Sequence, residues 1–485
     1  MPANPNPLAA QPVEAVAETT GLQRDMWVLD RHSAESAAAC LLALRIDLHG
    51  EFDRSAALAA LQRLYERHDA LRATFPDVGE MRIGAPRPLR VELVDLASLP
   101  PLEREARLAE RLRLAVSDPL DVRAGPLFRA ELIALQPTHH VVLLKAHHII
   151  CDGWSLGTLQ KEFALLYLHA LGRGSAPPPA PSFAQFVRAR VTEAKAREQQ
   201  NAAFWSRVFD PLPPALDLPT AWPRPPRRSA VSARLDHPLD PRLIERVRRQ
   251  GGAQGLTLFS MLFAAFNVVL SRICGSRDVV VGVPVAGQLR PGQHELVGLC
   301  LDFLPIRSAV DSESSFAAFA GAGRKQLLTA MRHGGYSLSE LLALLKVRRD
   351  PSRLPLINVV FTSVPESRQT VPDGLDLRMR GEQLARPYEQ FEVLAEVVVA
   401  GDQPRIECQY NSSLFDEMLV RGWLQSLEAV LERAADDLSV PCRELPVSVP
   451  TPATARSPAR PPGDVDAAAS VPRTQTELEV AALWQ

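Results

Sequence analysis

The feature that most constrains the fold is a proline-rich stretch near the middle of the chain, residues 211–229 (PLPPALDLPTAWPRPPRRS). Proline has no amide hydrogen and fixes its own φ angle, so this stretch can form neither a helix nor a central strand. A Gly/Pro-rich segment, residues 172–182, lies before it, and a charged helix reaching about residue 209 is predicted between the two. The two breaks divide the chain near its middle.

On either side of these breaks, segments in which hydrophobic residues recur with the period of a helix alternate with segments that have the pattern of a strand. In the first half the pattern predicts helices at 55–67 and 155–171 and strands at 71–75, 127–135 and 141–150, the last two as buried neighbours. In the second half it predicts helices at 256–273, 315–332, 338–345 and 416–435, and strands at 278–284, 299–310, 356–363, 391–399 and 405–410. The sequence therefore predicts two α/β halves.

The chain divides into five predicted segments. Residues 1–18 are rich in Pro and Ala and are predicted to be a flexible N-terminus. Residues 19–182 form the N-terminal half and residues 183–445 the C-terminal half. Residues 446–470 are a Pro/Ala linker, and residues 471–485 begin a new amphipathic helix that the end of the sequence cuts off.

Composition and charge exclude several classes of protein. Lys and Arg total 54 against 56 for Asp and Glu, whereas a nucleic-acid-binding protein needs a net basic surface. The six cysteines stand singly without a C-x-x-C spacing, which indicates reduced thiols rather than a zinc site or a disulfide framework. The N-terminus lacks the pattern of a signal peptide, and the longest apolar stretch, 258–270, is too short to span a bilayer. We expect a cytoplasmic protein with neither nucleic acid nor membrane as a partner.

The sharpest local feature is HHIICDGWSLG, residues 147–157, at a predicted strand-to-helix junction. Successive strand residues point to opposite faces, so His147 and His148 should not chelate one ion together, and no metal site is predicted. Gly153 would allow a sharp turn, and Ser155 would cap the helix. A histidine held at such a turn, with an ordinary pKa near 6.5, suits proton transfer or the positioning of an attacking amine. The other interpretation of the cluster is a hydrogen-bonded core histidine.

The same segment also permits a hydrolase. Gly153-Trp154-Ser155-Leu156-Gly157 matches G-x-S-x-G, the pattern of a nucleophile elbow between a strand and a helix. Such an enzyme needs an acid and then a histidine later in the chain, for which His237, His294 and His333 are available. Its fold also needs regular strand–helix alternation, which the second half does not show. Cys151 is an alternative nucleophile, although a buried cysteine at a strand end usually serves packing.

Six segments, in the same order, resemble the condensation domains of non-ribosomal peptide synthetases. HHIICDGWS resembles the HHxxxDG motif of that family. The others are TGLQRDMWVL (20–29), RHDALRATF (67–75), VGLCLDFLPIR (297–307), RDPSRLPL (349–356) and QYNSSLFD (409–416), which are similar to the motifs SxAQxRxWxL, RHxxLRTxF, IGxFVNTLPLR, RDxSRxPL and YNTDLFD. Together they cover residues 19–440. VAGQ (285–288) and RDPSRLPL look most like domains that act downstream of polyketide modules.

The resemblance implies a fold and an activity. The fold is two chloramphenicol-acetyltransferase-like halves arranged as a V, a pseudo-dimer with a central tunnel. The activity is that of an acyltransferase in natural-product biosynthesis: a donor acyl group on an upstream carrier protein is joined to an acceptor amine, or a hydroxyl, on a downstream carrier. The domain itself would bind no cofactor, because the substrates ride on phosphopantetheine arms of the carriers. We expect the excised domain to be a monomer.

The resemblance also implies roles for the motif residues. His148, the second histidine, would position or deprotonate the acceptor amine, and the backbone N–H of Gly153 would face the developing oxyanion. His147 and Asp152 would be structural.

In many members of the family an arginine after a glycine pairs with the motif aspartate. Here Gly287 is followed by Gln288, so the partner of Asp152 would have to be another arginine. The possible structural partners are Arg24, Arg72, Arg290 and Gln288.

Residues 471–485 resemble the first helix of a carrier domain, so they are interpreted as the truncated start of one, with no room for an adenylation domain before it. A third hypothesis for the whole chain is a catalytically silent domain that only docks carriers. The intact HHxxxDG motif disfavours it.

Overall fold

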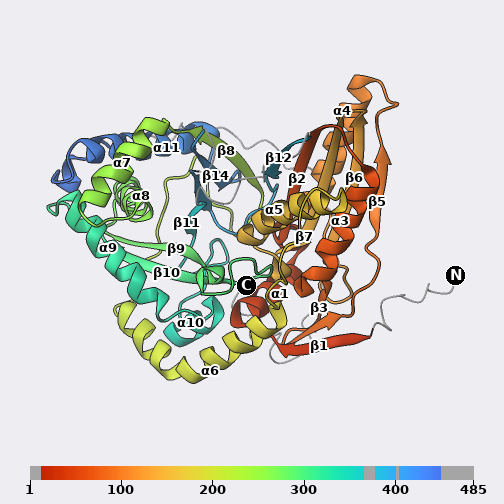
Figure 1. Ribbon diagram of the computed structural model, residues 1–485. Helices are drawn as coiled ribbons and strands as arrows, with labels where there is room; N and C mark the ends of the chain where they lie inside the picture. The colour runs from red at the N-terminus through yellow and green to blue at the C-terminus, as the bar shows by residue number, and fades with distance from the viewer. Residues whose placement is uncertain (1–11, 365–376, 400–402, 449–485) are drawn as a thin grey trace.

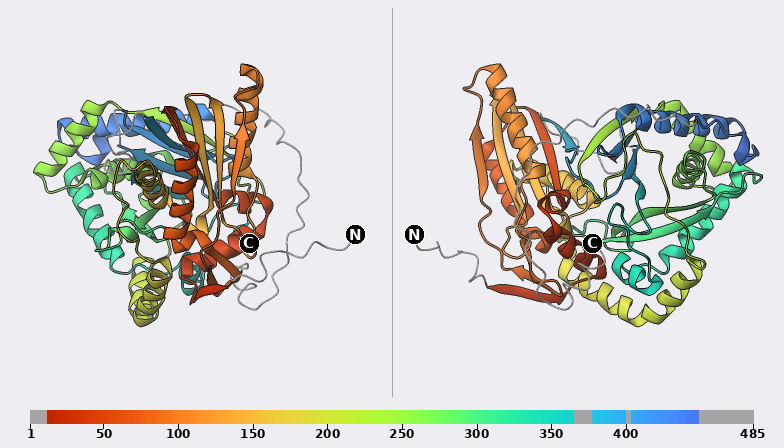
Figure 2. Two further views of the ribbon diagram at one scale, coloured as in Figure 1. Left: turned by 45° about the vertical axis from the view of Figure 1, so that its right-hand side comes forward. Right: turned by 180° about the vertical axis from the view of Figure 1, so that it is seen from behind.

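The computed structural model describes residues 12–364, 377–399 and 403–448 and contains two α/β halves that stand side by side (Figure 1). Seen from behind, they form two arms that meet where α1 (Gly21–His32), α6 (Phe183–Val208) and α10 (Leu338–Leu345) lie (Figure 2). This arrangement confirms the predicted α/β pseudo-dimer in the form of a V. The predicted tunnel stays a prediction.

The N-terminal half is built on a five-stranded sheet in the order β12-β2-β7-β6-β5. Its strands are β2 (Leu41–Gly50), β5 (Val91–Asp95), β6 (Phe128–Gln136), β7 (His139–His147) and β12 (Leu377–Gln383). Successive side chains of β2 point to opposite faces, so one set packs with α3 (Arg54–Arg67) and α5 (Gly153–Ala170), and the other packs with α4 (Pro101–Ser117). The sheet is therefore covered on both faces, with β7 at its centre.

The C-terminal half is built on a six-stranded sheet in the order β10-β9-β11-β13-β14-β8. Its strands are β8 (Ser232–Pro238), β9 (Asp278–Ala286), β10 (Leu301–Ala309), β11 (Val359–Val364), β13 (Val393–Val398) and β14 (Arg405–Asn411). Its core also includes side chains from α7 (Pro241–Ala253), α8 (Leu258–Cys274), α9 (Phe316–Met331) and α11 (Glu417–Asp436). Every residue of α8 from 260 to 271 is buried, as expected of a helix that is apolar on all sides.

One short helix and one small sheet complete the set of α-helices and strands in the described chain. α2 (Ala34–Ala39) leads into β2, and a three-stranded sheet has the order β1-β4-β3 with β1 (Val13–Glu18), β3 (Ala73–Asp77) and β4 (Glu80–Gly84). The prediction of a flexible segment at 1–18 is therefore wrong for its second part, because Val13–Glu18 pairs with β4. Residues 1–11 lie outside the described residues, as do the helix start predicted at 471–485 and all but the first three residues of the linker predicted at 446–470.

The boundary predicted between residues 182 and 183 does not separate the halves in space. α6 begins with Phe183 in the core of the N-terminal half, and Trp205 in its last turn lies in the core of the C-terminal half. In addition, β12 leaves the C-terminal half and pairs with β2 as the edge strand of the other sheet. Pairing between segments this distant in sequence leaves no local signal, so the sequence did not predict it.

Within the described ranges, no single helix is long and apolar enough to cross a membrane. Among the same residues, α7 and α8 taken together have the length and composition of a membrane span, but they are bent by 105° at the break between them.

Candidate functional site

The HHIICDG motif lies where β7 ends and α5 begins. β7 ends at His147, and His148–Ile150 form a 3-10 turn, so the strand predicted to reach residue 150 is three residues too long. His147 is fully buried, with its Nε2 3.0 Å from Oδ1 of Asp30. Its Nδ1 accepts the N–H of Ile149 at 3.0 Å, so the ring proton is on Nε2 and is donated to Asp30. This geometry fits the structural role expected of His147.

His148 differs from its neighbour because its ring is not tied to the fold in this way. Its backbone N–H donates to the carbonyl of Cys40 at 2.7 Å. Its ring Nδ1 is buried and has no hydrogen-bond partner among the described residues. Burial first, and then the positive charge of Arg386, lower the pKa of His148 to about 4. The imidazole is therefore neutral at pH 7 and keeps a lone pair.

Asp152 is the N-cap of α5, a role that the sequence pattern had favoured for Ser155. Its Oδ1 accepts the backbone N–H of Ser155 at 2.8 Å and lies 2.7 Å from the Ser155 hydroxyl. Its Oδ2 accepts the backbone N–H of Cys300 at 3.1 Å and Nε2 of Gln288 at 3.0 Å. The carboxylate is buried, and these donors supply the stabilisation that a cation would otherwise give.

The expectation that an arginine pairs with Asp152 is wrong. The three candidates bind other carboxylates: Arg24 binds Glu340 at 2.9 Å, Arg72 binds Glu14 at 3.1 Å and Arg290 binds Glu193 at 2.9 Å. Gln288, the fourth candidate, is fully buried and donates from Nε2 to the Asp152 carboxylate at 3.0 Å, which confirms it as a partner. A neutral amide suffices there because backbone N–H groups satisfy the rest of the carboxylate.

Gly153 is the first residue of α5 and is exposed. Its φ is not in the left-handed region, so the turn does not require a glycine, contrary to the expectation from the sequence. A Cβ built on Gly153 would meet no atom of the described protein within 4 Å. Its absence leaves open space beside Gly153 at the first turn of α5.

The hydrolase hypothesis fails on the geometry of Ser155. This residue is completely buried, and its hydroxyl lies 2.9 Å from the carbonyl of Gly298 and accepts the Gly298 N–H at 3.0 Å. The three candidate histidines are engaged elsewhere: His237 with Glu428, His333 with Asn201 and Phe204, and His294 with Trp154. A hydroxyl committed to Asp152 and Gly298 is not available as a nucleophile. Cys151 is no better placed, because burial raises the pKa of its thiol well above the ordinary value.

One loop of the C-terminal half, residues 287–300 between β9 and β10, holds the start of α5. It supplies Gln288 and Cys300 to Asp152, and its His294 carbonyl accepts the indole N–H of Trp154 at 2.8 Å. The loop can lie this close to the start of α6 because residue 298 is a glycine: a Cβ there would lie 2.1 Å from the Phe183 ring. The motif is thus built by both halves.

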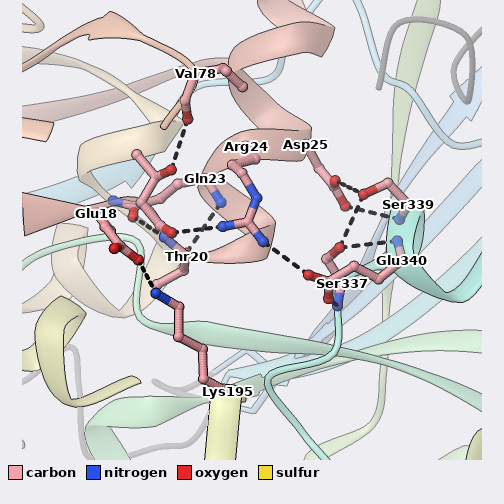
Figure 3. Close-up of polar contacts among 11 residues, drawn as sticks. Glu18, Thr20, Gln23, Arg24, Asp25, Val78, Lys195, Ser337, Ser339 and Glu340 are labelled. Carbon is pink, nitrogen blue, oxygen red and sulfur yellow. Dashed lines mark hydrogen bonds and ion pairs between the residues drawn. The ribbon is translucent and has the colours of Figure 1, made fainter. Parts of the chain in front are cut away.

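A second junction between the halves joins α1 to α10 (Figure 3). Here Arg24 forms its ion pair with Glu340, and the buried carboxyl of Asp25 accepts the backbone N–H of Ser339 at 3.3 Å and also the Ser339 hydroxyl. Burial raises the pKa of Asp25 to about 7. Thr20 and Ser337 close capping boxes at the starts of the two helices.

In the described part of the chain, one group of side chains has metal-ligand spacing, and it lies away from the motif. Asp47, His49 and His139 bring their ligand atoms within 4.8 Å of one another. His139 begins β7, whereas the motif follows the other end of that strand. Asp47 already pairs with Arg45 at 2.7 Å and with His139 at 2.9 Å, which reduces its capacity for a cation.

Sequence reasoning missed Asp30, Arg386 and the donor N–H of Cys300. Asp30 directly follows the motif segment 20–29 without being part of it, Arg386 lies outside all six motif segments, and a backbone N–H carries no side-chain signal at all. None could have been found without the fold.

Comparison with known proteins places this site in a family. The family model described as "Condensation domain" matches residues 13–452. The chain is 29% identical over 447 residues to tyrocidine synthase 3 of Brevibacillus parabrevis, covering 89% of this chain and 6% of that protein. It is 28% identical over 447 residues to gramicidin S synthase 2 of Aneurinibacillus migulanus, covering 89% and 10%. The curated relatives it matches are far longer, and the chain spans between 5% and 11% of their length.

Two solved structures show the same fold. A holo four-domain nonribosomal peptide synthetase superposes with a TM-score of 0.78 at 18% identity, over 91% of this chain and 35% of that one. The condensation domain of the Monacolin K polyketide synthase gives a TM-score of 0.77 at 18% identity, over 89% and 99%.

Proposed function

The chain belongs to the condensation-domain family, and from this premise we propose that it joins a donor acyl group on an upstream carrier protein to an acceptor amine on a downstream carrier. Condensation domains are acyltransferases, and the product is an amide, or an ester where the acceptor presents a hydroxyl. The acyl groups would arrive as thioesters on phosphopantetheine arms. We place the reaction in the cytoplasm, in peptide or hybrid polyketide biosynthesis, with the domain acting as a monomer.

The observation that carries this proposal is the environment of His148. The imidazole is neutral, its Nδ1 lacks a partner in the described structure, and His148 comes five residues before Gly153, the exposed first residue of α5. A side chain that the fold leaves with unused hydrogen-bonding capacity can serve a substrate. His147, by contrast, uses both ring nitrogens for the protein.

The proposed reaction follows from these groups. The amine nitrogen attacks the thioester carbon, a C–N bond forms, and negative charge develops on the carbonyl oxygen. The N–H of Gly153 and the positive end of the α5 dipole would stabilise that charge. Collapse of the intermediate breaks the C–S bond, and the proton lost by the nitrogen goes to the leaving thiolate.

The low pKa of His148 limits its part in this reaction. A ring with a pKa of about 4 is too weak a base to deprotonate an ammonium group at neutral pH. We therefore propose that the amine arrives neutral and that His148 accepts a hydrogen bond from it, which directs its lone pair at the thioester. Orientation of this kind is the main benefit that a site for two tethered substrates can give.

The test combines acyl-loaded donor carriers with candidate acceptor carriers and detects the product by intact-mass spectrometry. We expect His148→Ala to lower the rate by a factor of about 10² to 10⁴ while the protein stays folded. His49→Ala, in an exposed residue of β2, is the matched control. A His148→Ala variant whose condensation rate is within a few-fold of that of the unmodified protein would exclude His148 as the centre of the reaction. Transfer to no acceptor by the unmodified protein would favour the silent docking domain.

A further inference from the structure

We propose that Arg386 is a positioning residue for His148: it links the two halves, supports the backbone that holds His148, and places a positive charge near the imidazole. This inference rests on the proposed function. It adds a residue that lies 238 positions after His148 and outside the six motif segments quoted above.

The backbone of Arg386 belongs to the C-terminal half. It follows β12, the strand that crosses into the other sheet, and precedes β13. Its carbonyl accepts the hydroxyl of Ser232 in β8 at 3.0 Å and the side-chain amide of Gln409 in β14. Two strands of the C-terminal sheet therefore fix its position.

The side chain of Arg386 reaches the N-terminal half. Its Nη1 donates to the carbonyl of Ala39, the last residue of α2, at 3.2 Å. The next carbonyl along the chain, that of Cys40, accepts the backbone N–H of His148 at 2.7 Å. Neighbouring carbonyls thus bind Arg386 and His148. A change in the position of the guanidinium would move the peptide that supports the catalytic turn.

The charges around His148 show why a cation matters here. Asp152, at the start of α5, favours the protonated imidazole, whereas Arg386 and His147 oppose it, and burial opposes it most. Glu389 forms an ion pair with Arg386, and Asp30 faces His147 from α1. Loss of Arg386 alone would leave Asp152 as the charge that acts most on the ring, and it favours an imidazolium, which has no lone pair to offer an amine.

The ion pair with Glu389 also explains how the protein tolerates the charge of Arg386 in a mostly buried position. The side chains of Arg386 and Glu389 are only 13% and 4% exposed, so each would be costly without the other. Arg386→Gln would leave Glu389 unpaired and could unfold the segment. The double variant Arg386→Gln with Glu389→Gln removes both charges together and leaves no buried carboxylate alone.

The experiment measures the titration of His148 by NMR in protein with labelled histidine, so it needs neither carriers nor turnover. We expect Arg386→Gln to raise the titration midpoint of His148 by on the order of one unit, and the double variant to raise it by less. Arg386→Lys should keep most of the charge effect but not the fork of hydrogen bonds. Arg380→Gln, in an exposed arginine of β12, is the matched control.

Condensation measured against pH is the second readout. The rate of Arg386→Gln relative to that of the unmodified protein should fall as the pH approaches the NMR midpoint of the variant, and not in the control, because protonation of the amine affects all the proteins equally. An unchanged His148 midpoint in both the single and the double variant overturns the inference. If the unmodified protein makes no product with any carrier pair, the proposed function fails, while the NMR titration still decides whether Arg386 acts on His148.

Discussion

Two of the junctions between the halves stabilise a carboxylate with different chemistry. At the start of α5, the buried carboxylate of Asp152 has donors from Ser155, Gln288 and Cys300, and no cation pairs with it among the described residues. At the α1–α10 junction, Arg24 and Glu340 form an ion pair whose side chains are 31% and 38% exposed. Of these two junctions, water reaches the one with the ion pair and does not reach the one with the neutral donors.

This difference follows from the cost of removing charge from water. A buried ion pair must recover the hydration of two ions, whereas a carboxylate at a helix N-terminus is stabilised by N–H groups that the helix leaves free. The second junction contains its own contrast. Asp25 is as buried as Asp152 but has donors from Ser339 alone, and its pKa rises to about 7. At equal burial, the two aspartates therefore differ in the number of donors that they bind.

The largest effect should come from Asp152→Ala. The substitution removes the cap of α5 and leaves the buried donors of Gln288 and Cys300 without an acceptor, so we expect a loss of about 2 to 5 kcal/mol in the free energy of unfolding. Urea denaturation measures it. Asp53→Ala, which removes the exposed cap of α3 without touching the other half, should cost only about 1 kcal/mol. If Asp152→Ala is as stable as the unmodified protein but inactive, Asp152 acts directly in catalysis.

A pair of glycine substitutions should separate packing from catalysis at the same junction. In Gly298→Ala the new Cβ would lie 2.1 Å from the Phe183 ring, and we expect a loss of about 1 to 3 kcal/mol because α6 or the loop must move. In Gly153→Ala the Cβ meets no described atom within 4 Å, so stability should hold while the condensation rate falls. Thermal melts and condensation rates of both variants measure these effects. A loss of stability in Gly153→Ala together with unchanged stability in Gly298→Ala would contradict the prediction.

Asp25→Asn tests the buried carboxyl through pH. Because the folded-state pKa is raised from 3.8 to about 7, the stability associated with this group is fully present below pH 4 and is lost as the pH rises through 7. The asparagine variant does not titrate, so its stability relative to the unmodified protein should improve from pH 4 to pH 8. Unfolding free energies at several pH values measure the difference. A difference that does not change with pH would show that Asp25 does not titrate in this range.

Arg24→Gln should have the smallest effect. It breaks an ion pair that is about one third exposed on each side, and such pairs contribute roughly 0 to 1 kcal/mol. The small difference should shrink further in high salt, because screening weakens exposed pairs first. A loss above about 2 kcal/mol, measured by urea denaturation at low and high salt, would mean that the charged junction is as important as the neutral one.

Local sequence patterns predicted much of the fold. The helix predicted at 338–345 has the observed bounds, and the strands predicted at 127–135 and 141–150 are neighbours in the sheet. These elements depend on the spacing of apolar residues within one segment. β12 and the bridging course of α6 depend on partners far away in sequence, so no local pattern could predict them.

The sequence by itself determined the class of the protein, the position of the HHxxxDG motif and the presence of Gln288 in place of an arginine. Only the tertiary structure decided which group meets Asp152, that Ser155 is unavailable as a nucleophile, and that the charge of Arg386 reaches His148. The physical reason is that hydrogen bonding and electrostatic interaction depend on distance in space. The groups that satisfy Asp152 and influence His148 come from the other half of the chain, and folding alone brings them within reach.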